Sequence, residues 1–207
     1  MRALPPLLLT ALTLASVAGG PPRLPAPPTG SPLRLPFPAS YRERLSRYAV
    51  VDRPGGVVRF VYVTPGALDA ARRGESLPVG TTVVLETWRA RRDVRGAPLL
   101  GADGHLVPDR PTGTLDVMQK STDRPGDPRP WASARFDLAS GAQLDANLAD
   151  CRSCHESVAG RDHLFTGRAL ARFALTAQVQ RRDCARPDNQ LCPGDFEDSG
   201  PEPAEPR

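Results

Sequence analysis

Residues 151–155 read Cys-Arg-Ser-Cys-His, and this C-x-x-C-H stretch constrains the chain more than any other feature. The chain has only four cysteines and three histidines, and two of these cysteines and one of these histidines lie in this stretch. Positions i and i+3 of a helix share one face, so both thiols can reach one bound group, and the histidine that follows adds an imidazole. This spacing is the attachment signature of c-type haem. It predicts thioether bonds from Cys151 and Cys154 and a proximal iron ligand at His155.

Three other interpretations of these residues stay open. A disulfide between Cys151 and Cys154 would leave His155 without a role. A thioredoxin-like redox pair normally lies in a βαβ unit, and no such alternation precedes the stretch. A zinc site would need further ligands, which Cys184 and Cys192 could supply. In an exported protein those two cysteines more readily oxidise, so we predict a Cys184–Cys192 disulfide and one covalently bound haem c.

The two ends of the chain differ in composition from its middle. Residues 1–18 combine Arg2, an apolar run and small residues at the end, which is typical of a secretory signal peptide. The run is shorter than the ~20 residues of a spanning helix, so we expect no membrane span and an exported, periplasmic protein. Residues 19–38 form a proline-rich linker, and residues 193–207 form an acidic tail that we expect to be disordered. The haem domain is then 39–192.

The charge pattern argues against a nucleic-acid partner. The formal net charge is only +4, and no basic run is interleaved with aromatic residues. Arginine supplies nearly all of the positive charge, and Lys120 is the only lysine. We expect Lys120 to face solvent.

Periodicity predicts an α+β fold with a mostly antiparallel sheet and flanking helices, one of which carries the haem-attachment stretch. Four β-branched and aromatic stretches precede the last helices, which is typical of this class. In the last predicted strand, alternation places Trp131 and Phe136 on opposite faces. The predicted strands are 57–64, 81–88, 113–121 and 131–138, and the predicted helices are 40–48, 65–73, a stretch from 144 into C-x-x-C-H, and 164–179.

The ligand opposite His155 decides between electron transfer and the binding of small molecules. Many electron-transfer cytochromes of c type use a methionine downstream of the attachment site, but Met118 lies upstream and no methionine follows. His163 is too close in sequence to His155 to cross to the other side of the haem. His105 lies in a glycine-rich turn and is expected to be an exposed loop residue. Elimination favours an open sixth site for nitric oxide, hydroxylamine, carbon monoxide or peroxide.

Several segments in order, across roughly 39–167, resemble the cytochrome P-460 family, which includes the cytochromes c-prime-beta. The resemblance implies an antiparallel sheet with a c-type haem near the C-terminus, held by Cys151, Cys154 and His155, and a chain that can form a homodimer. Enzymatic members oxidise hydroxylamine and carry a bond from a lysine amine to a haem meso carbon, whereas the c-prime-beta members lack it and bind nitric oxide or carbon monoxide beside distal phenylalanines. The segments are Tyr41-Arg42, RFVYVTPGALDAARRG, LPVGTTVVLE, LDVMQKS, WASARFD and CRSCH with DHLFTG after it.

The sequence departs from this pattern at the cross-linking position. Leu85 stands where the resemblance places the lysine, and leucine has no amine. The family's distal carboxylate matches Asp116, which could act as a general base or could face water. Glu86 should point away from whatever Leu85 faces.

Further candidates for the distal pocket are Arg59, Phe60 and Phe136. The leading hypothesis is an exported monohaem cytochrome whose open site binds nitric oxide or related nitrogen species, with hydroxylamine oxidation as its enzymatic version. The alternative is a six-coordinate electron-transfer cytochrome of c type, which would need a redox partner protein. A third hypothesis is weak peroxidase activity that depends on Asp116.

Overall fold

A computed structural model describes residues 34–122 and 130–183 of this chain. The predicted signal peptide, most of the linker, the Cys184–Cys192 pair and the acidic tail lie outside the described residues. The described residues all belong to one compact unit, Leu33–Arg207.

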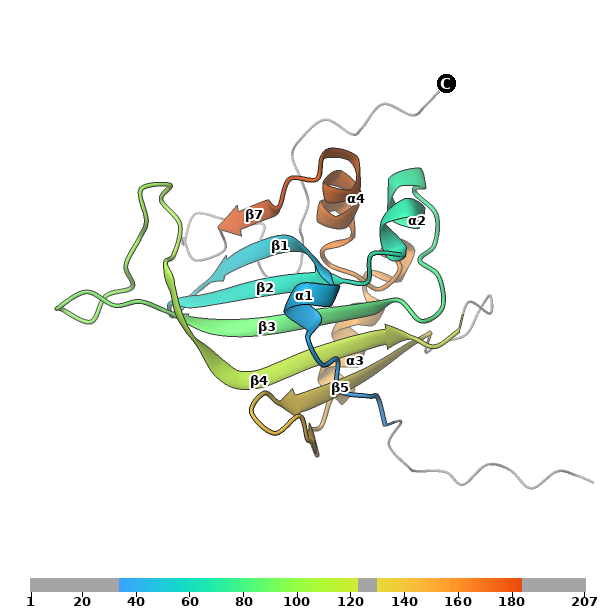
Figure 1. Ribbon diagram of the computed structural model, residues 1–207, viewed down its shortest axis with the longest axis horizontal. Coiled ribbons are helices and arrows are strands. Elements are labelled where there is room, and N and C mark those ends of the chain that lie inside the picture. The colour runs from blue at the N-terminus through green and yellow to red at the C-terminus, as the bar shows by residue number, and fades with distance from the viewer. Residues whose placement is uncertain (1–33, 123–129, 184–207) are drawn as a thin grey trace, which may run out of the picture. The chain divides into compact units, whose positions relative to one another are not determined.

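A seven-stranded sheet forms the framework of this unit (Figure 1). The strand order is β6-β5-β4-β3-β2-β1-β7, and every pair is antiparallel except the parallel pair of β1 and β7. The α+β prediction with a mostly antiparallel sheet is therefore confirmed. The strands are β1 Ser46–Arg53, β2 Val57–Val63, β3 Thr82–Ala90, β4 Pro108–Lys120, β5 Trp131–Asp137, β6 Gln143–Leu144 and β7 Gln180–Asp183.

The helices are short and lie mostly after the main strands. α2 (Ala67–Arg73) and α4 (Gly167–Thr176) pack on the β1–β3 part of one sheet face through alanines and Leu170. Small alanine side chains let the helices approach the strands closely. The other helices are α1 (Tyr41–Arg44), α3 (Ala149–Glu156) and a 3₁₀ turn at Ala159–Arg161.

The predicted helix at 40–48 is wrong beyond its first turn. α1 ends at Arg44, and residues from Ser46 onward form β1, which pairs with β2 on one side and β7 on the other. Ser40 has a φ of 56° and makes no side-chain capping bond, so the expected cap does not form. The β-branched pair Val50 and Val51 favours the strand, and pairing on both sides overrides the helical pattern.

The central strands are buried on both faces, which gives the unit two hydrophobic cores. One core lies under α2 and α4. The other lies on the opposite face, where Leu35, Tyr41 and Leu106 cover side chains such as Leu115 and Phe136.

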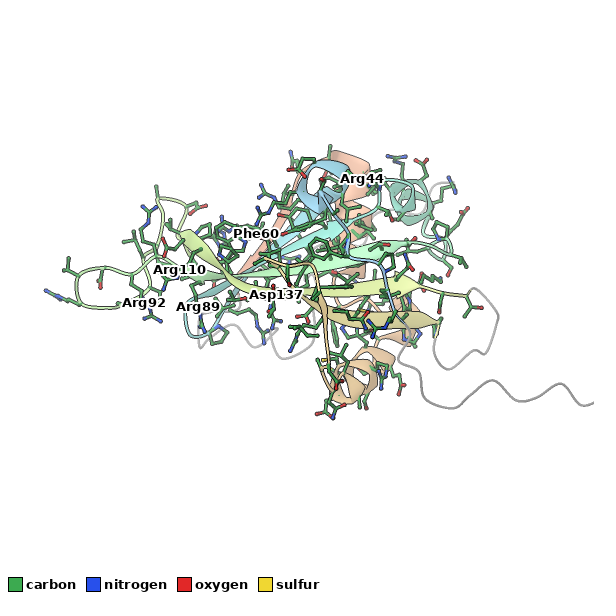
Figure 2. The ribbon with its side chains drawn as sticks, turned by 60° about the horizontal axis from the view of Figure 1, so that its bottom comes forward. Arg44, Phe60, Arg89, Arg92, Arg110 and Asp137 are labelled. Atoms are coloured by element: carbon green, nitrogen blue, oxygen red, sulfur yellow. The ribbon has the colours of Figure 1, made fainter. Side chains whose placement is uncertain are left out.

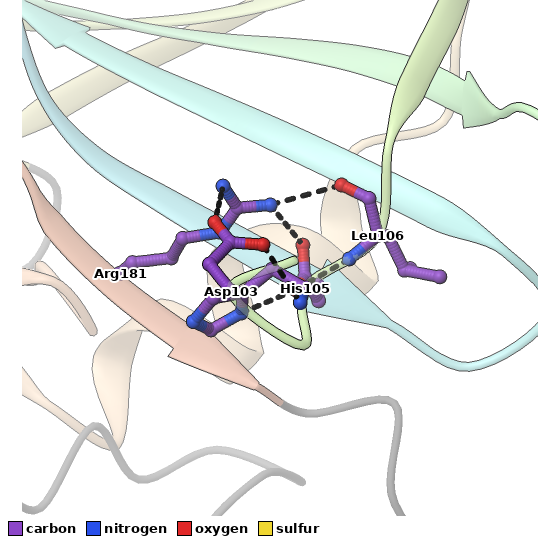
Figure 3. Close-up of polar contacts among 5 residues, drawn as sticks. Asp103, His105, Leu106 and Arg181 are labelled. Carbon is purple, nitrogen blue, oxygen red and sulfur yellow. Dashed lines mark hydrogen bonds and ion pairs between the residues drawn. The ribbon is translucent and has the colours of Figure 1, made fainter. Parts of the chain in front are cut away.

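The long β3–β4 connection is tied to β1 by Asp52, which is 1% exposed. Figure 3 shows His105 and Leu106 of this connection beside Arg181 of β7. His105 Nδ1 lies 2.7 Å from an Asp52 carboxylate oxygen, and the backbone N–H of Leu106 donates to the same oxygen at 3.1 Å. Arg181 of β7 donates to Asp52 at 3.4 Å and to the Leu106 carbonyl at 2.9 Å. His105, expected to be an exposed loop residue, is therefore a partly buried partner of Asp52.

Glu86 is fully buried on the face opposite α2 and α4 and accepts hydrogen bonds from two directions. Tyr62 Oη donates to Oε2 at 3.2 Å, and the Arg42 guanidinium forms an ion pair with the carboxylate from α1. Burial and the Glu86 charge raise the pKa of Tyr62 to about 12. Leu85 lies on the other face, so the expectation that Glu86 points away from it is confirmed.

Among the described residues, no helix combines the length and the apolar character that crossing a membrane requires.

Removing the Arg42 cation should destabilise the fold, because it leaves the Glu86 carboxylate buried with Tyr62 as its remaining side-chain donor. We expect Arg42→Met to lower the free energy of unfolding by about 2 kcal/mol in a denaturant titration. Arg44→Met on the same helix is the control, since Arg44 is exposed, and it should change stability by less than about 0.5 kcal/mol. Equal stability of the two variants would contradict a structural role for the Arg42–Glu86 pair.

Candidate functional site

The strand register builds a wall around Leu85 on the sheet face that also carries α2 and α4. Leu85 pairs with Val61 on β2 and with Asp116 on β4, and Asp116 pairs with Arg135 on β5. Directly paired residues point to the same face, so these side chains form one row. Met118 lies two residues beyond Asp116 on the same face and packs against the same core as Leu85.

The helix that carries the C-x-x-C-H stretch, α3, buries none of its eight residues. Figure 2 shows α3 below β5, on the side of the sheet away from the labelled Phe60. Cys151 and Cys154 are both exposed and are not joined in a disulfide. A helix that packs on an apolar sheet face normally buries one stripe of its side chains. Because α3 buries none, it is not packed directly against the wall.

A shallow hollow that is open to solvent lies between α3 and the sheet. On the sheet side it is lined by Met118, Trp131 and Ser133, and on the helix side by Arg152, His155 and Glu156. Pro130 and His163 complete the lining. The hollow therefore lies between the imidazole of His155 and the row that contains Met118.

A single hydrogen bond fixes the tautomer of His155. Its Nδ1 lies 2.6 Å from the backbone carbonyl oxygen of His163. A carbonyl can only accept, so Nδ1 carries the proton and Nε2 keeps its lone pair for a metal. The Phe165 ring contacts the imidazole edge to face, with ring centroids 5.1 Å apart. His155 is thus prepared as a ligand through Nε2.

Charged groups lie at the Cys151 end of the wall. Arg135 Nε donates to Asp116 at 2.6 Å, and this hydrogen bond raises the pKa of Arg135. Burial lowers the pKa of Arg59, whose charge also interacts with Asp116 and Cys151. The Asp116 carboxylate is therefore paired with Arg135 and only about one-third exposed to solvent.

The site fits a haem held on its helix side by two thioethers and one imidazole. The two thiols and Nε2 come from one helical stretch, as the attachment of c-type haem requires. Two buried donors on this sheet face, Arg59 Nε and Trp131 Nε1, have no hydrogen-bond partner among the residues that the structure describes. Buried donors are rarely left unpaired, and Trp131 lines the hollow, so a group bound there would account for the unpaired indole N–H.

Two of the predicted pocket residues lie on the wrong face. Phe60 packs edge to face on Trp88, and Phe136 packs on Phe37, both in the core opposite α3. Each is one residue out of phase with the wall along its strand, so neither can line the hollow. Arg59, Leu85 and Asp116 lie on the sheet face that borders the hollow, although they are not among its lining residues. Their role in a distal pocket stays a prediction.

The structure gives two residues, Met118 and Lys120, surroundings that the sequence did not predict. Met118 was set aside because it precedes the attachment stretch, yet it lines the hollow that His155 also lines. Lys120, expected to face solvent, is 2% exposed and forms an ion pair with Asp162 at 2.8 Å. Asp116, Met118 and Lys120 alternate along β4 and share one face, but alternation alone does not show that this face is covered.

The zinc interpretation finds no support among residues 34–122 and 130–183. No group of three or more histidine, cysteine or acidic side chains in that part of the chain could hold a metal ion. Further zinc ligands would have to come from outside it, where Cys184 and Cys192 lie.

Comparison with known proteins identifies the family. The family model described as Cytochrome P460 matches residues 38–166, which include the strands of the wall and all of α3. No curated protein matches the chain. Since the match covers more than half of the 207 residues, the chain belongs to the cytochrome P460 family, and this membership implies that it binds haem.

Proposed function

We propose that this protein is an exported monohaem cytochrome of c type whose open distal site binds nitric oxide or a related small nitrogen species. The observation that carries the proposal is the sheet face that borders the hollow, on which Leu85 stands where the resemblance places the lysine of the cross-linked members. Cys151 and Cys154 would hold the haem covalently, and His155 Nε2 would bind its iron. When bound, the haem supplies an iron whose sixth position can take a small ligand.

The lysine cross-link finds no donor in the described wall. Leu85 has no amine, and the only lysine of the chain is engaged elsewhere. Lys120 Nζ donates to both carboxylate oxygens of Asp162, at 2.8 and 2.9 Å, and to Ser76 Oγ at 2.7 Å. All three of its protons therefore have acceptors, which supports a haem without the meso-carbon bond.

The wall combines apolar and cationic side chains. Leu85 and Met118 would exclude water from the ligand side, which favours small neutral ligands. Arg59 and Arg135 add N–H donors, and such donors stabilise negative charge that develops on a bound nitrogen oxide. Export to the periplasm is proposed from residues 1–18 and from the attachment of c-type haem outside the cytoplasm.

Mass spectrometry and one optical spectrum test this proposal. We expect a mature chain that begins near Gly19, and a haem peptide that contains Cys151 and Cys154 but not Lys120. The reduced protein should have a high-spin spectrum that changes when carbon monoxide is added. Sharp low-spin bands with no response to carbon monoxide would contradict the open site, and a haem peptide joined to Lys120 would contradict the missing cross-link.

Met118 favours a second candidate, a six-coordinate electron-transfer cytochrome, because its thioether side chain lines the same hollow as His155. The two candidates differ in what Met118→Leu does. With an open site, the variant keeps the high-spin spectrum of the wild type, since leucine replaces methionine at similar volume. A low-spin wild type that becomes high-spin in Met118→Leu would establish methionine ligation instead.

Hydroxylamine oxidation is the enzymatic version of the proposal, and it requires a proton acceptor near the ligand. Asp116 is the wall carboxylate in the best position, although Arg135 holds it. If the protein turns over hydroxylamine or peroxide, Asp116→Asn should lower kcat roughly 100-fold. Asp109→Asn, an exposed position on the same strand, is the control, and an equal kcat in both variants would exclude Asp116 as the base.

A further inference from the structure

The turn after α3 holds the acceptor of the His155 proton in a fixed position. Asp162 and His163 both have left-handed backbone conformations, with φ of 54° and 61°. Neither is glycine, and such conformations persist where the surroundings enforce them. The turn directs the His163 carbonyl oxygen to within 2.6 Å of His155 Nδ1.

The Asp162 side chain anchors this turn to two other elements. Its Oδ2 accepts the backbone N–H of Leu77, in the connection after α2, at 2.7 Å. Its two oxygens also accept from Lys120 Nζ, at the end of β4. The lysine side chain is 3% exposed and that of Asp162 is 18% exposed, so solvent screens this pair only weakly.

We propose that Lys120 is a positioning residue for the proximal histidine. Through its ion pair with Asp162 it holds the turn in the conformation that presents the His163 carbonyl to His155 Nδ1–H. A strong hydrogen bond at Nδ1 makes an imidazole a more basic ligand through Nε2. The pair therefore tunes how strongly His155 donates electrons to the iron, and this inference depends on the haem site proposed above.

This role differs from a purely structural ion pair in what its loss changes. If Lys120→Met loosens the turn, the Nδ1 hydrogen bond weakens and the imidazole becomes less basic. The ferric state, which a basic ligand favours, is then less stabilised. A structural pair would lower the unfolding temperature without changing the properties of the iron.

The experiment uses the haem-loaded full chain and two readouts that do not depend on activity, namely the midpoint potential and the iron–histidine stretching frequency of the ferrous form by resonance Raman spectroscopy. We expect Lys120→Met and Asp162→Asn to raise the potential and to lower the stretching frequency. The asparagine variant keeps the size of the side chain and tolerates the left-handed conformation, so it decides the question if Lys120→Met does not fold.

Arg181→Met is the matched control. It also removes a cation from a buried aspartate, Asp52, but this cation is on β7, which lies away from α3 (Figure 1). We expect it to lower the unfolding temperature and to leave both readouts unchanged. Lower stability of the two Lys120–Asp162 variants with wild-type values of both readouts would overturn the positioning role. A wild-type protein without covalent haem would instead refute the proposed function.

Discussion

Burial of both faces of the central strands is the constraint on which the site depends. Side chains along a strand alternate between faces, so a slip of one residue in β3 would exchange Leu85 and Glu86. Glu86 tolerates complete burial only where Arg42 and Tyr62 reach it. The buried carboxylate on one face therefore fixes which residue stands at the centre of the wall on the other. The face on which Leu85 lies depends on a charged group that is buried on the opposite face of the sheet.

α3 is held by other means than the rest of the fold. It buries no residue, whereas the turn that follows it buries Val158 and Leu164. Tyr48 of β1 is hydrogen-bonded at 2.5 Å to Thr166, at the end of this turn. The chain thus fixes α3 from its C-terminal end and leaves its thiols exposed. A helix packed on the sheet by its own apolar face would have closed the hollow.

Much of the wall could be predicted from alternation, because a period of two residues assigns faces without knowledge of the partners. Leu85 and Glu86 were separated correctly in this way. Alternation does not tell which face α3 covers, because both faces are apolar here, so it could not decide between Arg59 and Phe60 as pocket residues. β7 reads Gln-Arg-Arg-Asp and has no apolar alternation at all, so its pairing with β1 depends on tertiary structure. The burial of Lys120 likewise depends on Asp162, which is 42 residues away in sequence.

The chemistry of lysine explains why the single lysine of an arginine-rich chain stands at position 120. Its ammonium group has three donors, and they meet three acceptors: the two carboxylate oxygens of Asp162 and the hydroxyl of Ser76. An arginine at this position would have to fit a larger planar group with five donors into the same buried space. Lys120 therefore matches its surroundings in both size and number of hydrogen bonds. Leu85 offers the wall no amine, and the only lysine amine of the chain is bound to the turn that holds His155.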